Sequence, residues 1–541
     1  MSKHLRIAIL ILLIPIFSWA DHYPINKQAD VLHYSFGLTL SDSTNEIVGI
    51  THIKVRFNKA GMSQFRLDLA NQTEKRQRKG MKVDAISFGG IPLQYSHNND
   101  ALLIHLNNPT KEAEEIVFRI QYHGIPADGL RIGATKFGDR SFFNENWPNR
   151  TRHWLPTIDH PYDKATSEFI VTAPAKYKVV SNGLLLEESD LGNNQKLTHW
   201  KQSIPVSSWL FVLGVAEFAV QYVDQFEGKS IQTWVYAKNR DAGFYDFAAP
   251  TKQVLEFYSK YVGPFAYEKL ANIQTPSVNG GMETSSAIFY GEDLVNGKRD
   301  ERTRNVVIHE IAHQWFGNAV TESTWDDAWL SEGFATYFTL LFIEHAYGKE
   351  AFHKGLQKAR KTVLDMSPKW PQYSIVADRT AEQEAVTNNL TYQKGAWILH
   401  MLRLLIGDVA FKKGIQSYYQ KYYNANTTTD QFRVEMEKAS RKKLEQFFKQ
   451  WLYQPSLPKL KAEWAYDAKL KQLKIKVKQL QEGGAYFNMP LELGYYEKGN
   501  SKPTVVTVQI DQAEKNFTFQ LKQAPDKIIV DPNNKLIAQI L

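Results

Sequence analysis

The amino-acid sequence predicts an α+β protein of several domains, with β-rich parts at both ends and a mostly helical part between them. The chain has 541 residues, too many for one hydrophobic core, so roughly three to four units are expected. Short stretches that alternate between apolar and polar residues occur towards both ends, as in half-buried strands. Apolar residues at helical spacing dominate the middle of the chain.

The first twenty residues have the pattern of a secretory signal peptide. A basic start at Lys3 and Arg6 precedes an apolar run, and small residues follow at Ser18 and Ala20. The run is about thirteen residues long, shorter than the roughly twenty needed to cross a bilayer. We therefore expect residues 1–20 to be removed from an exported protein, periplasmic or secreted, with no stable membrane insertion. An uncleaved anchor is the alternative.

Residues 21–238 are predicted to form a large antiparallel β domain. Alternation is clear in Ile53–Phe57 and in Thr198–Trp200, and turn residues such as Asn182–Gly183 separate such stretches. Alternation returns in residues 456–541, where we expect a small β-sandwich.

Residues 239–455 are predicted to form a mostly helical domain with a small sheet at its front. Apolar residues recur at helical spacing in four segments, which are Thr251–Tyr261, Arg302–Phe316, Trp329–Ala346 and Tyr392–Leu405. Gly317 and Gly348 follow two of these segments, at positions where helices commonly stop.

Composition excludes some functions and narrows the metal chemistry. The formal net charge is +8, but acidic residues are interleaved with the basic ones. The sequence therefore does not show the clustered basic region that is typical of nucleic-acid-binding proteins. The chain contains no cysteine, so any metal site has to use His, Asp or Glu.

A HExxH motif, His309–Glu310–Ile311–Ala312–His313, lies inside a predicted helix. Residues four apart lie on the same helical face, so both imidazoles can bind one metal ion. Glu310 is then close enough to act on a water molecule at the metal. A chance match without function is the alternative at this stage.

Glu332 supplies a third candidate ligand. Eighteen residues separate it from His313, and it lies near the start of the next predicted helix, which can return it to the histidine pair. Two imidazoles and one carboxylate leave a fourth zinc position open, as in catalytic rather than structural zinc sites. A buried carboxylate paired with an arginine is the alternative for Glu332.

Taken together, the motifs resemble the aminopeptidase N family of zinc metallopeptidases. The matching segments are Gly280–Thr284, His309–His313, Gln314–Asn318, Trp325 with Asp327, Trp329–Ala335 and Tyr392–Ala396. The resemblance implies an N-terminal β domain, a thermolysin-like catalytic domain and a C-terminal β-sandwich. It also implies a short member, without the large C-terminal helical domain that many members add.

The resemblance assigns a role to each candidate. One Zn²⁺ per chain would bind His309, His313 and Glu332, with Glu310 as the general base. Tyr392 would donate a hydrogen bond to the developing oxyanion.

Peptide substrates with a free N-terminal amine are expected. Gly280, Gly281, Met282 and Glu283 would bind the substrate, with Glu283 holding its ammonium group. Glu145 of the N-terminal domain would assist, with a salt-bridged surface glutamate as the alternative.

The chain departs from the family pattern at one position: Thr284 stands where the family has asparagine in its Gly-x-Met-Glu-Asn signature. The contact that this asparagine makes is therefore absent or replaced.

Other functions remain open at this stage. An epoxide hydrolase or a thermolysin-like endopeptidase would share the zinc residues, although Glu283 argues against an endopeptidase. A binding protein of the same fold would usually have lost ligands or the base, and here they are all present. The sequence predicts neither the preferred N-terminal residue nor the oligomeric state.

Overall fold

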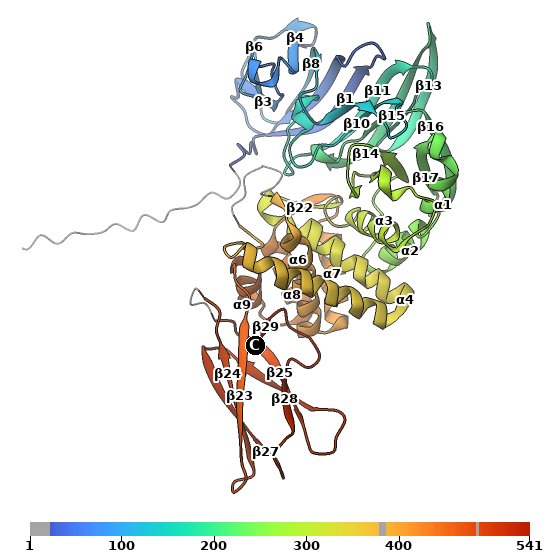
Figure 1. Ribbon diagram of the computed structural model, residues 1–541. Helices are drawn as coiled ribbons and strands as arrows, with labels where there is room; N and C mark the ends of the chain where they lie inside the picture. The colour runs from blue at the N-terminus through green and yellow to red at the C-terminus, as the bar shows by residue number, and fades with distance from the viewer. Residues whose placement is uncertain (1–21, 378–385, 483–485) are drawn as a thin grey trace, which may run out of the picture.

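The computed structural model describes residues 22–377, 386–482 and 486–541, so the predicted signal peptide lies outside the described residues. A β-rich N-terminal part, a helical middle and a C-terminal part of two sheets follow one another along the chain (Figure 1). The α+β class, the β-rich N-terminal domain and the helical domain are as predicted. Among the described residues, no helix combines the length and apolarity that crossing a membrane requires.

An eight-stranded sheet of order β13-β14-β11-β1-β2-β8-β4-β5 dominates the N-terminal part. Its strands are β1 (Ala29–Thr39), β2 (Ile47–Phe57), β4 (Gly80–Phe88), β5 (Ile91–Pro92), β8 (Glu114–Ile125), β11 (Lys164–Pro174), β13 (Leu184–Gly192) and β14 (Gln195–Ser207). Every second side chain of β2 is buried, as its alternating sequence dictates. One pairing departs from the predicted antiparallel arrangement: β1 and β11 run parallel. The chain forms other sheets between these two strands, and this long connection permits the parallel pairing.

Two smaller sheets complete this part. One has the order β12-β15-β10-β9 and the other β3-β7-β6. Their strands are β3 (Gln64–Asp68), β6 (Tyr95–Asn98), β7 (Ala101–His105), β9 (Leu130–Ala134), β10 (Arg140–Asn144), β12 (Lys178–Ser181) and β15 (Leu213–Ala216). Strand β10 ends at Asn144, directly before the candidate Glu145.

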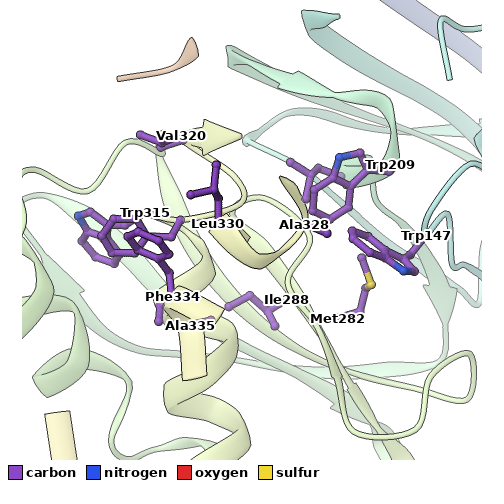
Figure 2. Close-up of a cluster of buried hydrophobic side chains, with 14 of the residues drawn as sticks. Trp147, Trp209, Met282, Ile288, Trp315, Val320, Ala328, Leu330, Phe334 and Ala335 are labelled. Carbon is purple, nitrogen blue, oxygen red and sulfur yellow. The ribbon is translucent and has the colours of Figure 1, made fainter. Parts of the chain in front are cut away.

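A buried aromatic cluster joins the N-terminal part to the helical part. The Trp147 ring centroid lies 5.0 Å from that of Trp209 and 4.5 Å from that of Trp325 in the helical part. Figure 2 shows Trp147 and Trp209 close to Met282 and Ala328. Because this core is shared, the segment after β10 is held against the helical part.

A five-stranded sheet of order β16-β17-β18-β20-β19 stands at the front of the helical part. Its strands are β16 (Phe218–Phe226), β17 (Lys229–Tyr236), β18 (Lys269–Thr275), β19 (Gly281–Met282) and β20 (Ala287–Gly291). This sheet crosses the predicted domain boundary between residues 238 and 239, because β16 and β17 pair with strands that follow it. Strand β19 is an edge strand, so one side of its backbone is not paired within the sheet.

The helices of this part are α1 (Arg240–Phe247), α2 (Thr251–Tyr261), α3 (Glu301–His313), α4 (Trp329–Met366), α6 (Asn389–Ile406), α7 (Asp408–Lys421), α8 (Thr429–Ser440) and α9 (Glu445–Phe448). Short strands β21 (Val320–Glu322) and β22 (Ala425–Thr427) pair between them. Helix α3 begins after Asp300, whose carboxylate accepts a hydrogen bond from the Thr303 N–H at 2.8 Å. Helix α6 begins with a capping box between Asn388 and Thr391.

Helix α4 is divided at Gly348, where φ is 88°. The predicted stop at this glycine is therefore correct for the first segment, but a second helical segment begins immediately after it. The two segments pack together, since a Cβ on Gly355 would lie 2.4 Å from the Leu340 side chain. Glycine is required at this turn because side chains disfavour a positive φ.

The C-terminal residues form two sheets, of order β27-β24-β23-β29 and β26-β25-β28. Their strands are β23 (Lys459–Asp467), β24 (Gln472–Gln479), β25 (Met489–Tyr496), β26 (Thr504–Ile510), β27 (Glu514–Gln520), β28 (Lys527–Val530) and β29 (Gln539–Ile540). The predicted β content is present, and a face-to-face sandwich of the two sheets stays a prediction.

Helices α4 and α6 approach closely at two glycines. A Cβ on Gly395 would lie 2.9 Å from the Gly333 Cα, closer than real Cβ atoms approach other atoms. We expect Gly395→Val to push the helices apart and to lower the free energy of unfolding by about 1–3 kcal/mol, as overpacking does. Urea unfolding measures this. Gly133→Val is the control, because the nearest atom to a Cβ there is 4.0 Å away; equal stability of both variants would contradict the packing argument.

Candidate active site

The two histidines of the HExxH motif lie on one face of α3, as their spacing predicts. Their Nε2 atoms are 3.1 Å apart. The buried His313 has Nδ1 3.1 Å from the Phe316 carbonyl oxygen, which accepts a hydrogen bond from it, and 3.0 Å from the Ser331 hydroxyl. With its proton on Nδ1, His313 presents the lone pair of Nε2 to a metal ion.

The first turn of α4 brings Glu332 to this pair. Its Oε2 lies 3.4 Å from Nε2 of His309 and 3.2 Å from Nε2 of His313. Its Oε1 accepts a hydrogen bond from the Tyr392 hydroxyl at 2.7 Å. The close approach of α4 and α6 therefore brings the third candidate ligand and the candidate oxyanion donor together.

Glu310 lies against the edge strand β19. A Cβ on Gly281 would be 2.3 Å from the Glu310 carboxyl carbon, so a glycine is needed for this strand to pass the carboxylate. Burial and the neighbouring Glu283 raise the pKa of Glu310 well above its ordinary value. Gly280 precedes the strand at a φ of 93°.

Glu283 follows β19 and is buried in the same place. Its Oε1 is 3.9 Å from Nδ1 of His313 and, among the described residues, has no hydrogen-bond donor. Burial raises the pKa of Glu283 to about 7. Its backbone carbonyl accepts hydrogen bonds from the Gln314 amide at 2.9 Å and the Asn318 amide at 2.6 Å, and these fix the position of the segment.

Thr284, the departure from the family signature, is also buried. Its hydroxyl donates to the Ala287 carbonyl at 2.5 Å, so it closes the turn between β19 and β20. The side chain is thus engaged in a local turn.

Glu145 reaches the site from the N-terminal part. Its Oε1 accepts a hydrogen bond from the Trp147 N–H at 2.8 Å, and its other oxygen forms an ion pair with Arg150. Arg150 also lies 3.6 Å from Asp128. Both oxygens of Glu145 are therefore engaged, whereas Oε1 of Glu283 has no hydrogen-bond donor among the described residues.

One cavity of about 550 Å³ contains most of these groups. Its lining includes Glu145, Trp147, Arg150, Gly281, Met282, Glu283, His309, Glu310, His313, Glu332 and Tyr392. Gly280 adjoins this lining through Gly281. The structure thus brings the sequence-predicted residues of both domains to one place.

The donor set fits a zinc ion. Nitrogen and oxygen atoms of His309, His313 and Glu332 converge, and Oε2 of Glu332 is buried without a hydrogen-bond donor among the described residues. Although burial lowers the pKa of His313, Glu283 and Glu332 raise it to about 10, which reflects an excess of negative charge. A divalent cation balances this charge.

A second group, Glu283 with Glu310 and His313, is also close enough for a metal. Glu283 approaches His313 at Nδ1, however, and Nδ1 already donates to the Phe316 carbonyl. We therefore assign the metal to His309, His313 and Glu332.

The fold and the His-His-Glu centre define a zinc metallopeptidase type of protein, and comparisons with known proteins agree. Residues 247–451 match the Peptidase family M1 domain, and residues 30–210 match the Peptidase M1 N-terminal domain. The chain belongs to peptidase family M1.

Individual relatives support this. The chain is 30% identical to the glutamyl aminopeptidase of Rattus norvegicus over 66% of its own length and 39% of the relative's. It is 31% identical to aminopeptidase A of Gloydius brevicauda, over 82% and 48% of the two chains. It thus spans less than half the length of these curated relatives.

A solved structure matches more of its own length. The M1 zinc metallopeptidase mutant of Deinococcus radiodurans bound to a Tyr-Ser-Ala substrate superposes with a TM-score of 0.68 at 26% identity. The match covers 80% of this chain and 96% of the other.

The sequence analysis included several supporting residues in its matching segments but assigned them no role. Ser331 and Phe316 orient His313, and Gln314 and Asn318 hold the Glu283 backbone. Gln314 and Asn318 immediately follow the HExxH motif, so their position next to the ligands was the available signal. A salt bridge of Glu145 was the alternative considered from the sequence, and the structure identifies Arg150 as its partner.

Metal binding by this centre gives a direct prediction. We expect one zinc ion per chain, and a chelator should lower the melting temperature, since a ligand at a thousand times its Kd stabilises by about 4 kcal/mol. Glu332→Gln should lose the zinc. Glu310→Gln, on the adjacent helix but outside the ligand set, should keep it. Metal analysis with thermal unfolding measures both, and equal zinc loss in the two variants would refute the ligand assignment.

Proposed function

We propose that this chain is an exported zinc aminopeptidase, which hydrolyses the first peptide bond of peptides with a free N-terminal amine. The observation that carries the proposal is the buried Glu283 carboxylate beside the metal ligands. Its Oε1 lacks a hydrogen-bond donor among the described residues. A buried carboxylate oxygen without a hydrogen-bond donor is costly, and a substrate ammonium group would supply a charge and a donor to it.

The position of Glu283 accounts for the removal of a single residue. Atoms of Glu283, Glu310 and His313 lie within 4.8 Å of one another. An ammonium group held by Glu283 is therefore one residue away from a carbonyl carbon beside Glu310. An acetylated amine would leave the carboxylate unpaired, which is the kind of penalty that gives strong discrimination.

When bound, zinc supplies Lewis-acid polarisation of the peptide carbonyl and lowers the pKa of a water molecule. Glu310, buried beside the zinc ligands, would take a proton from the attacking water and pass it to the leaving nitrogen. Burial and Glu332 raise the pKa of Tyr392 well above its ordinary value, so its hydroxyl keeps its proton. That hydroxyl, which donates to Oε1 of Glu332 in this structure, would turn from Glu332 to donate to the oxygen that becomes negative.

The names of the relatives agree with this proposal. Those compared above are called glutamyl aminopeptidase and aminopeptidase A, and the Deinococcus radiodurans structure contains a tripeptide substrate. Glu145 would complete the amine site from the N-terminal domain, next to its partner Arg150.

The free-amine requirement is tested with amino-acid anilides in free and acetylated form, with and without a chelator. We expect chelator-sensitive cleavage of the free set, and a loss in kcat/KM of about 10–100-fold in Glu283→Gln from the lost charge-assisted contact. Desamino anilides are the control, because without an amine the wild type and the variant should be equally poor.

The other readings predict different results. Equal cleavage of acetylated substrates would refute the aminopeptidase proposal and favour an endopeptidase. Zinc binding without cleavage of any substrate would favour a binding protein, and hydrolysis of epoxides alone would favour the epoxide hydrolase.

Export is tested on full-length protein produced with its first twenty residues. The signal-peptide pattern supports cleavage after Ala20, so we expect the N-terminus of the exported protein to be Asp21. Fractionation with N-terminal sequencing measures this. An intact N-terminus on protein found only inside the cell would refute the export proposal.

A further inference from the structure

A second cavity, of about 900 Å³, adjoins the first at the metal centre. His309 and Tyr392 line both cavities. Glu145 and Glu283 line the first but not the second. The second cavity therefore leads away from the site proposed for the substrate amine. We call it the leaving-side groove, because it lies beyond the bond to be cleaved.

The two segments of α4, together with α3, form the walls of this groove. The turn at Gly348 folds the second segment back on the first, so that Leu340 and Ile343 from the first segment and Ala359 from the second line the same groove. These apolar side chains provide a floor for a peptide backbone.

Basic side chains dominate the charged lining of the groove. Arg302, Arg304, Lys354 and Lys358 line it, and Glu301 is the one acidic residue among its described lining residues. The first cavity, by contrast, is lined by four glutamates, at positions 145, 283, 310 and 332, and one arginine. Charge thus changes sign across the metal centre.

The four basic side chains differ in whether they already contact an acidic or aromatic group. Arg302 forms an ion pair with Asp293 at 2.7 Å, and the Arg304 guanidinium lies 4.4 Å from the Tyr347 ring centroid. Lys354 and Lys358 are exposed, and neither forms a salt bridge with another described residue. They are four residues apart on α4, so they point to the same side.

We propose that the leaving-side groove binds the part of the substrate after the cleaved bond and selects peptides with a carboxylate there. This rests on the proposed aminopeptidase activity. The carboxylate can be an acidic side chain or the free C-terminus of a short peptide, since both offer the same group to Lys354 and Lys358. The acidic first cavity then attracts the positively charged amino end of the peptide, and the basic groove attracts its carboxylate, so the two cavities together orient the peptide.

The dimensions of α3 agree with this. Arg304 precedes His309 by five residues, which corresponds to about 7.5 Å along a helix axis. An extended peptide covers that distance in roughly two to three residues. A carboxylate on the third or fourth residue of the substrate therefore comes level with Arg304, which lines the groove together with Lys354 and Lys358.

The test compares kcat/KM for Ala-Ala-Glu-Glu-amide with that for Ala-Ala-Gln-Gln-amide, which has the same shape without charge. A second pair, Ala-Ala-Ala as free acid and as amide, tests the C-terminal source of the carboxylate. The variant is Lys354→Gln with Lys358→Gln. Lys349→Gln is the matched control, because Lys349 is exposed on α4 but does not line the groove. Alanine anilide, which carries no carboxylate beyond the cleaved bond, reports on the catalytic centre.

We expect the wild type and Lys349→Gln to prefer the charged member of at least one pair by about fivefold or more, and less in high salt. The double variant should reduce this preference to below twofold. A preference near one in the wild type, or one that the double variant leaves intact, would overturn the groove proposal while anilide cleavage upholds the proposed function. Zinc-loaded wild type that cleaves no anilide would overturn both.

Discussion

The rest of the site depends on one electrostatic constraint: several buried carboxylates surround a single pair of imidazoles. Glu283, Glu310 and Glu332 are all buried within contact of His313 or its neighbours. Such charges are costly to bury without a cation. Burial alone would raise the pKa of Glu332, but His313 and His309 lower it to about 2, so this carboxylate is ionised and ready to bind metal. A zinc ion and, under the proposed function, a substrate ammonium group would supply the positive charges that this arrangement requires.

The scaffold serves to bring these groups close. Glycine, which has no side chain, stands at two places where elements approach closely. Gly281 lets the edge strand β19 pass Glu310, and Gly333 with Gly395 lets α4 pack against α6. The first contact positions Glu310, and the second brings Glu332 on α4 to Tyr392 on α6, so the packing of these elements determines the geometry of the site. The shared tryptophan core has the same effect for the N-terminal domain, because it holds the segment after β10 beside the first cavity, which Glu145 and Trp147 line.

The sequence was sufficient to predict the functional residues that are positioned by a single helix or by two consecutive helices. The spacing of His309 and His313 follows from the helical period, and Glu332 follows from a helix that returns. Tyr392 was accessible through family resemblance alone, because sixty residues separate it from its partner Glu332 and no periodicity links them. Contacts between elements, such as that of Gly281 with Glu310, could not be predicted, since they depend on register and packing. The parallel pairing of β1 with β11, the sheet that crosses the predicted boundary and the folding back of α4 were missed for the same reason.

The most direct test of the whole account is a crystal structure of the zinc-loaded Glu310→Ala variant with a tripeptide bound. The account predicts the peptide amine against Glu283, the first carbonyl between the metal and the Tyr392 hydroxyl, and the remaining residues in the leaving-side groove between α3 and α4. A peptide bound in the opposite direction, or an amine placed away from Glu283, would contradict it.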